Sequence, residues 1–420
     1  MHHQTLLPNG LRVVSAELPH AASVAVGIWV GVGGRHEPAA LGGISHFIEH
    51  LLFKGTRRRT AGMISEAVEG VGGYLNAFTD EEHTCFYARA HATRFPVLLD
   101  VLLDMFLESR LDPVEIDKER TVILDELAMY RDQPADLVHD VLNAVQFPGD
   151  PLGRPVIGTR ATLRRLGRAD FTRYLRTHYV SGATVIAVAG NLRHEEVVRR
   201  VRRFSRHFRT GVRPQIPPAR PPRGKPAVKL LSKANEQTNF GLGVRAASRH
   251  DPRRHALRLL NVILGENMSS RLFQVVREEH GLTYNVQSSL TTWEDTGDIV
   301  VSAGLDTAEL ERTLRLIVGE MNRLREHAPS KAEVRRARDY VLGQFDLSLE
   351  STEHHMMWLG EQWVNLGSLT PPEEIRRRIS AVTPGEIRSA ARDFLAPHLR
   401  SLALVSPRKH DRGLLDIVAA

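Results

Sequence analysis

The segment HFIEHLLFKGT, residues 46–56, places two histidines and a glutamate among large apolar side chains. His46 and His50 are four residues apart, so in a helix they share one face, and Glu49 lies beside them. Burying such groups without partners is unfavourable, because each group loses its hydration. Two imidazoles at this spacing can bind one zinc ion, with Glu49 next to a metal-bound water. The segment therefore indicates a catalytic zinc site that needs a third protein ligand.

A second segment offers carboxylates for that position. The helix expected after Asp112 carries Glu119 and Glu126 two turns apart on its apolar stripe, whereas Asp125 points the opposite way. The stripe consists of Ile116, Ile123, Leu127 and Tyr130. Carboxylates on a core-facing stripe need a partner as much as the two histidines do. A shared zinc ion would satisfy both segments.

Together these segments resemble the pitrilysin/insulinase family of zinc metallopeptidases, also called inverzincins. The resemblance is strongest to the branch that includes mitochondrial processing peptidase and its bacterial relatives. It rests on H-x-x-E-H, on ERTVILDE ending 126 − 50 = 76 residues later, and on NGLRVV, GGYLNAFTDEEHTCFY, LGRPVIGT and SSRLFQVVREEHGLTYNVQS. It implies that His46, His50 and Glu126 are zinc ligands and that Glu49 is the general base. It also implies that Glu119 supports the site without being a ligand.

The resemblance further implies that the second half of the chain completes the catalytic chamber. Arg271 in SSRLFQ and Tyr284 in GLTY match the family's arginine and tyrosine. Tyr284 would stabilise the oxyanion, and Arg271 would orient either the substrate or that tyrosine. Taken alone, Arg271 also fits a surface residue at a helix start, and Tyr284 an aromatic side chain in a sheet core.

The stretch YLNAFTDEEHTCFY alternates in hydrophobicity and predicts an edge strand near the metal site. An extended peptide could pair with such a strand by strand addition. Asn76, Ala77 and Phe78 are the candidate substrate-binding residues. Core packing is an almost equally good interpretation of Phe78.

The elements that position these residues occur twice along the chain. The segment 213–226 contains six prolines and predicts an exposed linker. On each side of it a strand (84–90, 297–304) is followed by a long helix and by a second helix with a predicted N-cap, at Asp112 and Ser330. We therefore expect an α+β protein of two related α/β domains, each a mostly antiparallel sheet with helices packed on it, from an internal duplication.

Only the first repeat carries the metal-site residues. Aligning Glu115 with Glu333 gives an offset of 218, which places Ala337 and Gln344 where the first half has its two glutamates. We expect a catalytic zinc-binding domain at 1–212, a linker at 213–226, and a related domain without metal at 227–420.

The amino-acid composition limits which classes of protein the chain can belong to. The chain has 420 residues, one cysteine and a net charge of +7, with no apolar run near the roughly 18 residues that span a membrane. Cys85 excludes internal disulfides and is expected as a small buried side chain, which fits a cytoplasmic location. The arginines 57–59 are the best candidate for a basic patch, but no nucleic-acid-binding motif accompanies them. A membrane or a nucleic acid is not an expected partner.

We expect a zinc-dependent endopeptidase that hydrolyses peptides or unfolded polypeptides. The alternative is a non-catalytic subunit of the same fold that binds peptides or a partner protein. Shorter members of the family pair two chains to build a four-domain chamber. Since this chain carries both the metal motif and the Arg271/Tyr284 stretch, we expect a homodimer.

Overall fold

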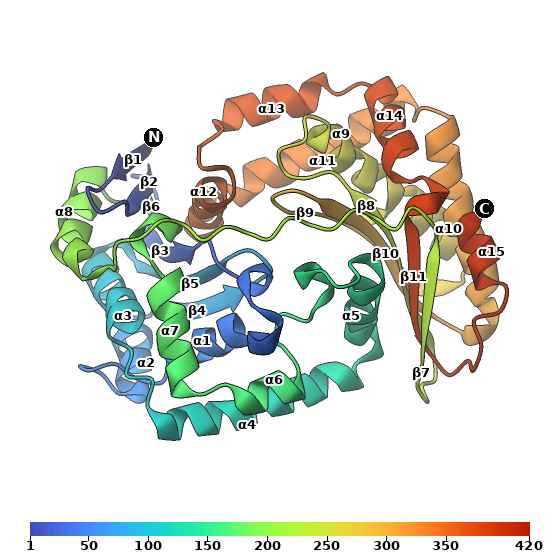
Figure 1. The fold of residues 1–420 in the computed structure, drawn as a ribbon. Helices are drawn as coiled ribbons and strands as arrows, with labels where there is room; N and C mark the ends of the chain where they lie inside the picture. Colours follow the sequence, from blue (N-terminus) through green and yellow to red (C-terminus); the bar gives the residue numbers. More distant parts are fainter. The chain divides into compact units, whose positions relative to one another are not determined.

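Two units, each a β-sheet with helices packed on it, make up the chain (Figure 1). The computed structural model describes residues 1–420. The first unit consists of Met1–Leu127, Pro155–Pro217 and Asp346–Thr370, and the second of Ala128–Arg154, Pro218–Phe345 and Pro371–Ala420. These units differ from the continuous domains 1–212 and 227–420, because each takes one segment from the other half of the chain.

The first sheet has six strands in the order β1-β2-β6-β3-β5-β4. Their bounds are β1 His2–Leu6, β2 Arg12–Glu17, β3 Ser23–Val30, β4 Tyr74–Thr79, β5 Thr84–His91 and β6 Thr184–Gly190. β1 and β2 form a hairpin, whose turn uses Gly10 at φ +91°. All pairings are antiparallel except the β2–β6 pair. The sheet ends on β4, so this strand has a free edge.

The second sheet repeats this order of pairings with one strand fewer. It runs β7-β11-β8-β10-β9, with β7 Ala227–Ser232, β8 Thr238–Ala246, β9 Thr283–Thr292, β10 Gly297–Leu305 and β11 Arg400–Ser406. Its parallel pair, β7–β11, corresponds to β2–β6. The remaining pairs are antiparallel, so the two sheets match strand for strand from β2 onward. This confirms the prediction of two related, mostly antiparallel domains.

Helices cover both faces of the first sheet. On one face, apolar residues of α1, α2, α3 and α8 join the strands in a single core. On the other face lies α12, which packs on β3 and β6 (Figure 1). Gly360 permits this close packing, because a Cβ at that position would collide with the ring of Trp29. The bounds in this unit are α1 Ile44–Leu52, α2 Ala61–Glu69, α3 Phe95–Glu108, α4 Pro113–Asp132, α6 Arg160–Arg165, α7 Arg168–His178, α8 His194–Phe204 and α12 Thr352–Leu366.

The second unit is arranged in the same way. The helices of its larger core lie on one face of the sheet, and α5 packs on β8 and β11 from the other face. Gly241 and Gly243 on β8 bring α5 close, since a Cβ at either position would press on Leu142. The bounds are α5 Pro134–Gln146, α9 Arg254–Asn261, α10 Leu310–Glu326, α11 Lys331–Ser348, α13 Pro372–Ala381, α14 Pro384–Phe394 and α15 Leu414–Ala419. Thus α5 and α12 are the helices that each half of the chain supplies to the other half's sheet.

Several local predictions are also tested by the structure. Residues 213–226 contain no helix or strand, and Cys85 is fully buried. The N-caps are present: Asp112 Oδ1 accepts the N–H of Val114 at 2.9 Å, and Ser330 Oγ accepts that of Glu333 at 3.2 Å. No helix combines the length and apolar composition needed to cross a membrane.

The prediction of a basic patch at residues 57–59 is wrong. Arg58 and Arg59 both pair with Asp100 and Asp104 on α3, at N–O distances of 2.5 to 3.0 Å. Arg57 lies 3.3 Å from the carboxylate of Glu108. These carboxylates neutralise the cluster and tie the loop after α1 to α3.

Candidate metal centre

α1 carries the H-x-x-E-H segment and is fixed by both its apolar face and its start. Ile44, Phe47, Ile48, Leu51 and Leu52 are buried in the core of the first unit. The histidines and the glutamate therefore lie on the opposite face.

The start of α1 is held by a buried carboxylate. Glu37 accepts the N–H of Gly43 at 2.7 Å and that of Ser45 at 2.8 Å, which satisfies free donors of the first helical turn. Gly43 has φ +93°, and a Cβ there would lie 2.6 Å from the carbonyl oxygen of Ile157. The direction of the helix is thus set by groups outside the motif.

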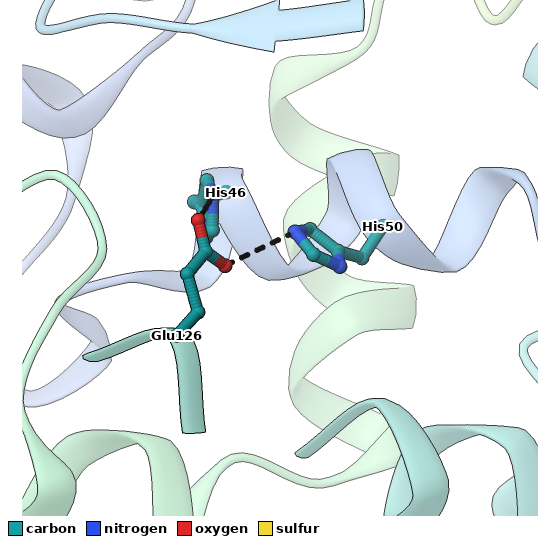
Figure 2. Close-up of side chains that lie close together, drawn as sticks. All are labelled: His46, His50 and Glu126. Atoms are coloured by element: carbon teal, nitrogen blue, oxygen red, sulfur yellow. Dashed lines mark ion pairs between the residues drawn. The ribbon is translucent and has the colours of Figure 1, made fainter. Parts of the chain in front are cut away.

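Three donor groups converge where α4 passes α1 (Figure 2). The Glu126 carboxylate lies 3.8 Å from His46 Nε2 and 3.6 Å from His50 Nε2, and all three ligand atoms lie within 4.8 Å of one another. These separations are too long for hydrogen bonds. The two distances from the Glu126 carboxylate are close to the ~3.3 Å between ligands that share a tetrahedral zinc at about 2.0–2.1 Å. The residues present therefore fit a zinc ion.

The second ring nitrogen of His50 is held by Glu119. His50 Nδ1 lies 3.1 Å from Glu119 Oε2, and the other oxygen of Glu119 is 2.7 Å from Lys54 Nζ. The side chain of Glu119 is 6% exposed, against 47% for Glu126. A carboxylate in this place orients the imidazole and leaves Nε2 free as a ligand. Glu119 thus lies behind His50, and Glu126 lies beside both imidazole Nε2 atoms.

The imidazole of His46 is in the form that binds metals. Burial, with a smaller effect of the neighbouring His50, lowers the pKa of His46 to about 4. Its Nδ1 is buried and has no hydrogen-bond partner within the protein, while its Nε2 faces Glu126. A neutral imidazole is what coordination requires.

Glu49 is linked to the edge strand. Its Oε2 accepts a hydrogen bond from the hydroxyl of Thr79 on β4 at 2.6 Å. Burial raises the pKa of Glu49, and the hydrogen bond from Thr79 offsets part of that effect. The carboxylate is therefore held next to the two histidines, and its raised pKa makes it a stronger proton acceptor than an ordinary glutamate.

The candidate substrate-binding residues occupy the edge strand, with side chains on alternate faces. Ala77 packs in the core that contains α1. On the other face, the Asn76 amide donates to the Tyr74 hydroxyl at 2.7 Å, and the Phe78 ring packs edge-on against Trp29 at 5.5 Å. The prediction of an edge strand is confirmed, and the side chain of Phe78 serves as packing in this structure. The N–H of Ala77 donates to Asn76 Oδ1 at 2.9 Å, so a peptide that pairs with β4 at this residue would displace that side chain.

Arg271 and Tyr284 belong to the second unit. Arg271 Nε lies 2.8 Å from Glu333 Oε1, and its guanidinium is 3.6 Å from Glu320. Tyr284 is 85% exposed on β9, and its ring faces the guanidinium of Arg277 at 4.8 Å. The sheet-core alternative for Tyr284 is therefore wrong, and Arg271 is held in a carboxylate cluster, not free at a helix start. Their catalytic roles stay predictions.

Two residues at the site were not predicted from the sequence. Lys54 lies two residues beyond the end of α1, outside the helix, so no helical spacing marks it. Thr79 contacts Glu49 across 30 positions of sequence, and no local pattern marks it.

Comparison with protein families gives two matches. The model described as insulinase (Peptidase family M16) matches residues 12–160, and the model described as Peptidase M16 inactive domain matches residues 165–341. The first match contains His46, His50, Glu49 and Glu126. The second begins beyond all of them.

Similar proteins match along nearly the whole chain. A protein of Streptomyces coelicolor described as an uncharacterized zinc protease is 39% identical over 99% of this chain and 92% of its own length. Uncharacterized zinc proteases of Mycobacterium tuberculosis and Bacillus subtilis are 37% and 34% identical, covering 98% and 95% of this chain and 94% and 97% of their own lengths. Among solved structures, a protease from Helicobacter pylori has a TM-score of 0.91 at 20% identity, covering 97% of this chain and 99% of its own. A Pseudomonas fluorescens structure titled as a peptidase M16 inactive domain has a TM-score of 0.90 at 19% identity, covering 97% and 98%.

Proposed function

Because the chain belongs to the insulinase family of peptidases (Peptidase M16), we propose that it is a zinc-dependent endopeptidase acting on peptides or unfolded polypeptides. The observation that carries this proposal is the meeting of His46, His50 and Glu126 around one point, with Glu49 beside them. His46, His50 and Glu126 would hold the zinc ion. When bound, zinc supplies a Lewis acid and lowers the pKa of a water molecule.

The chain's own residues divide the remaining work. Glu49 takes a proton from the attacking water and gives it to the leaving amine, while Thr79 holds its carboxylate in place. Glu119 and Lys54 keep the His50 ring in one tautomer. None of these three supporting groups needs to touch the substrate.

The free edge of β4 supports a polypeptide substrate. Thr79 at the end of this strand bonds Glu49, so a peptide paired with β4 would run past the general base. Strand pairing uses backbone groups, which every extended peptide offers. We therefore propose substrates defined by an unfolded conformation, with Asn76, Ala77 and Phe78 as the pairing segment.

Metal analysis and peptide digestion test the proposal together. The purified protein should bind about one zinc per chain after reconstitution, as a site with three protein ligands requires. A quenched peptide library should be cleaved by this protein, and the cleavage should stop with a chelator and return with zinc. Absence of zinc after reconstitution would refute the metallopeptidase assignment. Zinc binding with peptide binding but no turnover would favour the non-catalytic subunit.

A further inference from the structure

A groove lies between the first strand and α8, away from the metal centre. β1 is an end strand of the first sheet, so one of its edges has no strand partner. α8 packs on the same end of the sheet through Val197, Val198 and Val201. The hollow between them has a volume of about 490 Å³ and is lined by Thr5, Glu195, Val198 and three arginines of α8.

His194 fixes the two walls of this groove. Its Nε2 lies 2.8 Å from the hydroxyl of Thr5 on β1, and its Nδ1 lies 2.8 Å from that of Ser15 on β2. Its backbone N–H donates to Glu17 at 2.8 Å. Burial lowers the pKa of His194, so the ring acts as a neutral bridge. The distance between α8 and β1 is thereby held by hydrogen bonds.

The arginines of the groove have no partner in the protein. Arg199, Arg202 and Arg203 occupy positions i, i+3 and i+4 of α8, so they share one face, and all three are exposed. None of them forms a hydrogen bond or an ion pair through its guanidinium, whereas the neighbouring Arg200 pairs with Glu196 at 2.8 Å. Glu195, four residues before Arg199, offsets part of this charge, but the lining remains positive by two charges, and like charges on one face repel one another. An anionic ligand would relieve that repulsion.

The free edge of β1 favours a polypeptide over other anionic ligands. An unpaired strand edge offers backbone donors and acceptors that an extended polypeptide can use. Side chains on one face of such a strand repeat every ~6.7 Å, and Arg199 lies about 4.5–6 Å along α8 from Arg202 and Arg203, so neighbouring acidic side chains of an extended segment could reach different arginines. A phosphate ligand would use the guanidinium groups and leave the strand edge unpaired. We propose that this groove binds an extended, acidic polypeptide segment, which adds to β1 and places its carboxylates against Arg199, Arg202 and Arg203.

This site is separate from the proposed catalytic centre. β1 and β4 are opposite edges of the first sheet, about 24 Å apart by five inter-strand steps of about 4.8 Å. Binding at β1 therefore does not depend on zinc or on Glu49.

Fluorescence anisotropy with a labelled twelve-residue peptide of alternating Asp and Thr tests the proposal. The full-length Glu49→Gln protein keeps the probe intact, and mass spectrometry of the recovered probe shows separately whether cleavage occurs. The triple change Arg199→Gln, Arg202→Gln and Arg203→Gln should weaken binding about tenfold or more, because three exposed charge pairs with the carboxylates of the probe are lost. The matched control changes Arg160, Arg164 and Arg165 on α6 to Gln and should bind as the parent does.

Variants of the probe test separately the charge pairing with the arginines and the backbone pairing with β1. A peptide with Asn in place of Asp should bind at least tenfold more weakly, and added salt should weaken the acidic probe. Two further probes carry N-methyl groups, one on all Asp backbone nitrogens and the other on all Thr backbone nitrogens. One of these two probes should fail to bind and the other should bind normally, because only one set of N–H groups faces β1. The proposal would be overturned if both N-methylated probes bound equally well, or if the α6 control lost as much affinity as the α8 variant. It would also be overturned if triphosphate or a single-stranded oligonucleotide bound more tightly than the acidic peptide and depended on the same arginines.

Discussion

Glu49 and the groups around it show how single residues divide roles at this site. Thr79 holds the Glu49 carboxylate, while burial raises its pKa above the ordinary value of a glutamate. Glu119 and Glu126 lie on one helix but face different atoms of His50, Nδ1 and Nε2. Each carboxylate therefore has a distinct, testable consequence.

Changing Glu49 to Gln should separate metal binding from hydrolysis. The substitution removes a base but no ligand, so zinc content should remain near one per chain while peptide turnover falls by 10² to 10⁴ or more. Zinc analysis and library digestion on the same preparation measure both. Turnover close to that of the wild type would refute the role of Glu49.

Changing Glu126 to Gln should weaken zinc binding more than changing Glu119 to Gln. Glu126 faces both Nε2 atoms, whereas Glu119 orients one ring, and loss of an orienting partner costs roughly 10–100-fold in affinity or activity. Competition with a zinc chelator ranks the two variants. The opposite order would make Glu119 the third ligand.

At the level of the helix, α1 depends on groups that precede it. Glu37 bonds two N–H groups of its first turn, and Gly43 provides the left-handed turn that starts it. At its other end, the loop with Arg58 and Arg59 is tied to α3 by Asp100 and Asp104. The histidines are thus positioned by anchoring at both ends of a short helix.

Changing Glu37 to Gln should destabilise the first unit by about 1–2 kcal/mol. An amide oxygen can accept only part of the two hydrogen bonds and lacks the charge that favours a helix N-terminus. Denaturant unfolding measures the loss, and Glu69→Gln at an exposed position of α2 is the control. Equal stability of the two variants would mean that the apolar face alone fixes α1.

Across the whole molecule, each sheet is covered by one helix from the opposite half of the chain. α12 packs on the first sheet and α5 on the second, and α4 crosses from one unit into the other. The two units therefore cannot be separated by cutting the linker at 213–226. The unit without metal-site residues therefore stays joined to the unit that carries the candidate zinc site.

Changing Tyr284 to Phe tests whether the second unit contributes to catalysis. The substitution removes only a hydroxyl, and the ring is exposed, so folding and zinc content should not change. A donor to a developing oxyanion is worth about 10²–10³ in rate, and turnover should fall within or somewhat below that range. Tyr340→Phe in the same unit is the control.

Arg271→Ala should raise KM if Arg271 binds substrate, or match Tyr284→Phe if it positions the tyrosine. Wild-type kinetics in both variants would confine the site to the first unit.

The assembly in solution is a separate expectation. Because the chain resembles shorter family members that pair two chains into a four-domain chamber, we expect a homodimer. Light scattering across a dilution series measures the mass alongside activity. A fully active monomer at nanomolar concentration would contradict this expectation.

The sequence alone sufficed for features that depend on local spacing. The four-residue step between His46 and His50, the helical stripe carrying Glu119 and Glu126, and the alternation of β4 each follow from one element's period. The repeated order of strands and helices gave the two related domains. The caps at Asp112 and Ser330 were likewise readable, because a cap and its partner lie within four residues.

Only the tertiary structure decided contacts between elements far apart in the chain. The bond from Thr79 to Glu49, the pairing of Arg58 and Arg59 with α3, and the exchange of α5 and α12 depend on which strands become neighbours. Strand order is set by burial summed over the whole sheet, and no local pattern encodes it. For the same reason, the arginines of α8 could be recognised as unpaired only after every carboxylate near them had a position.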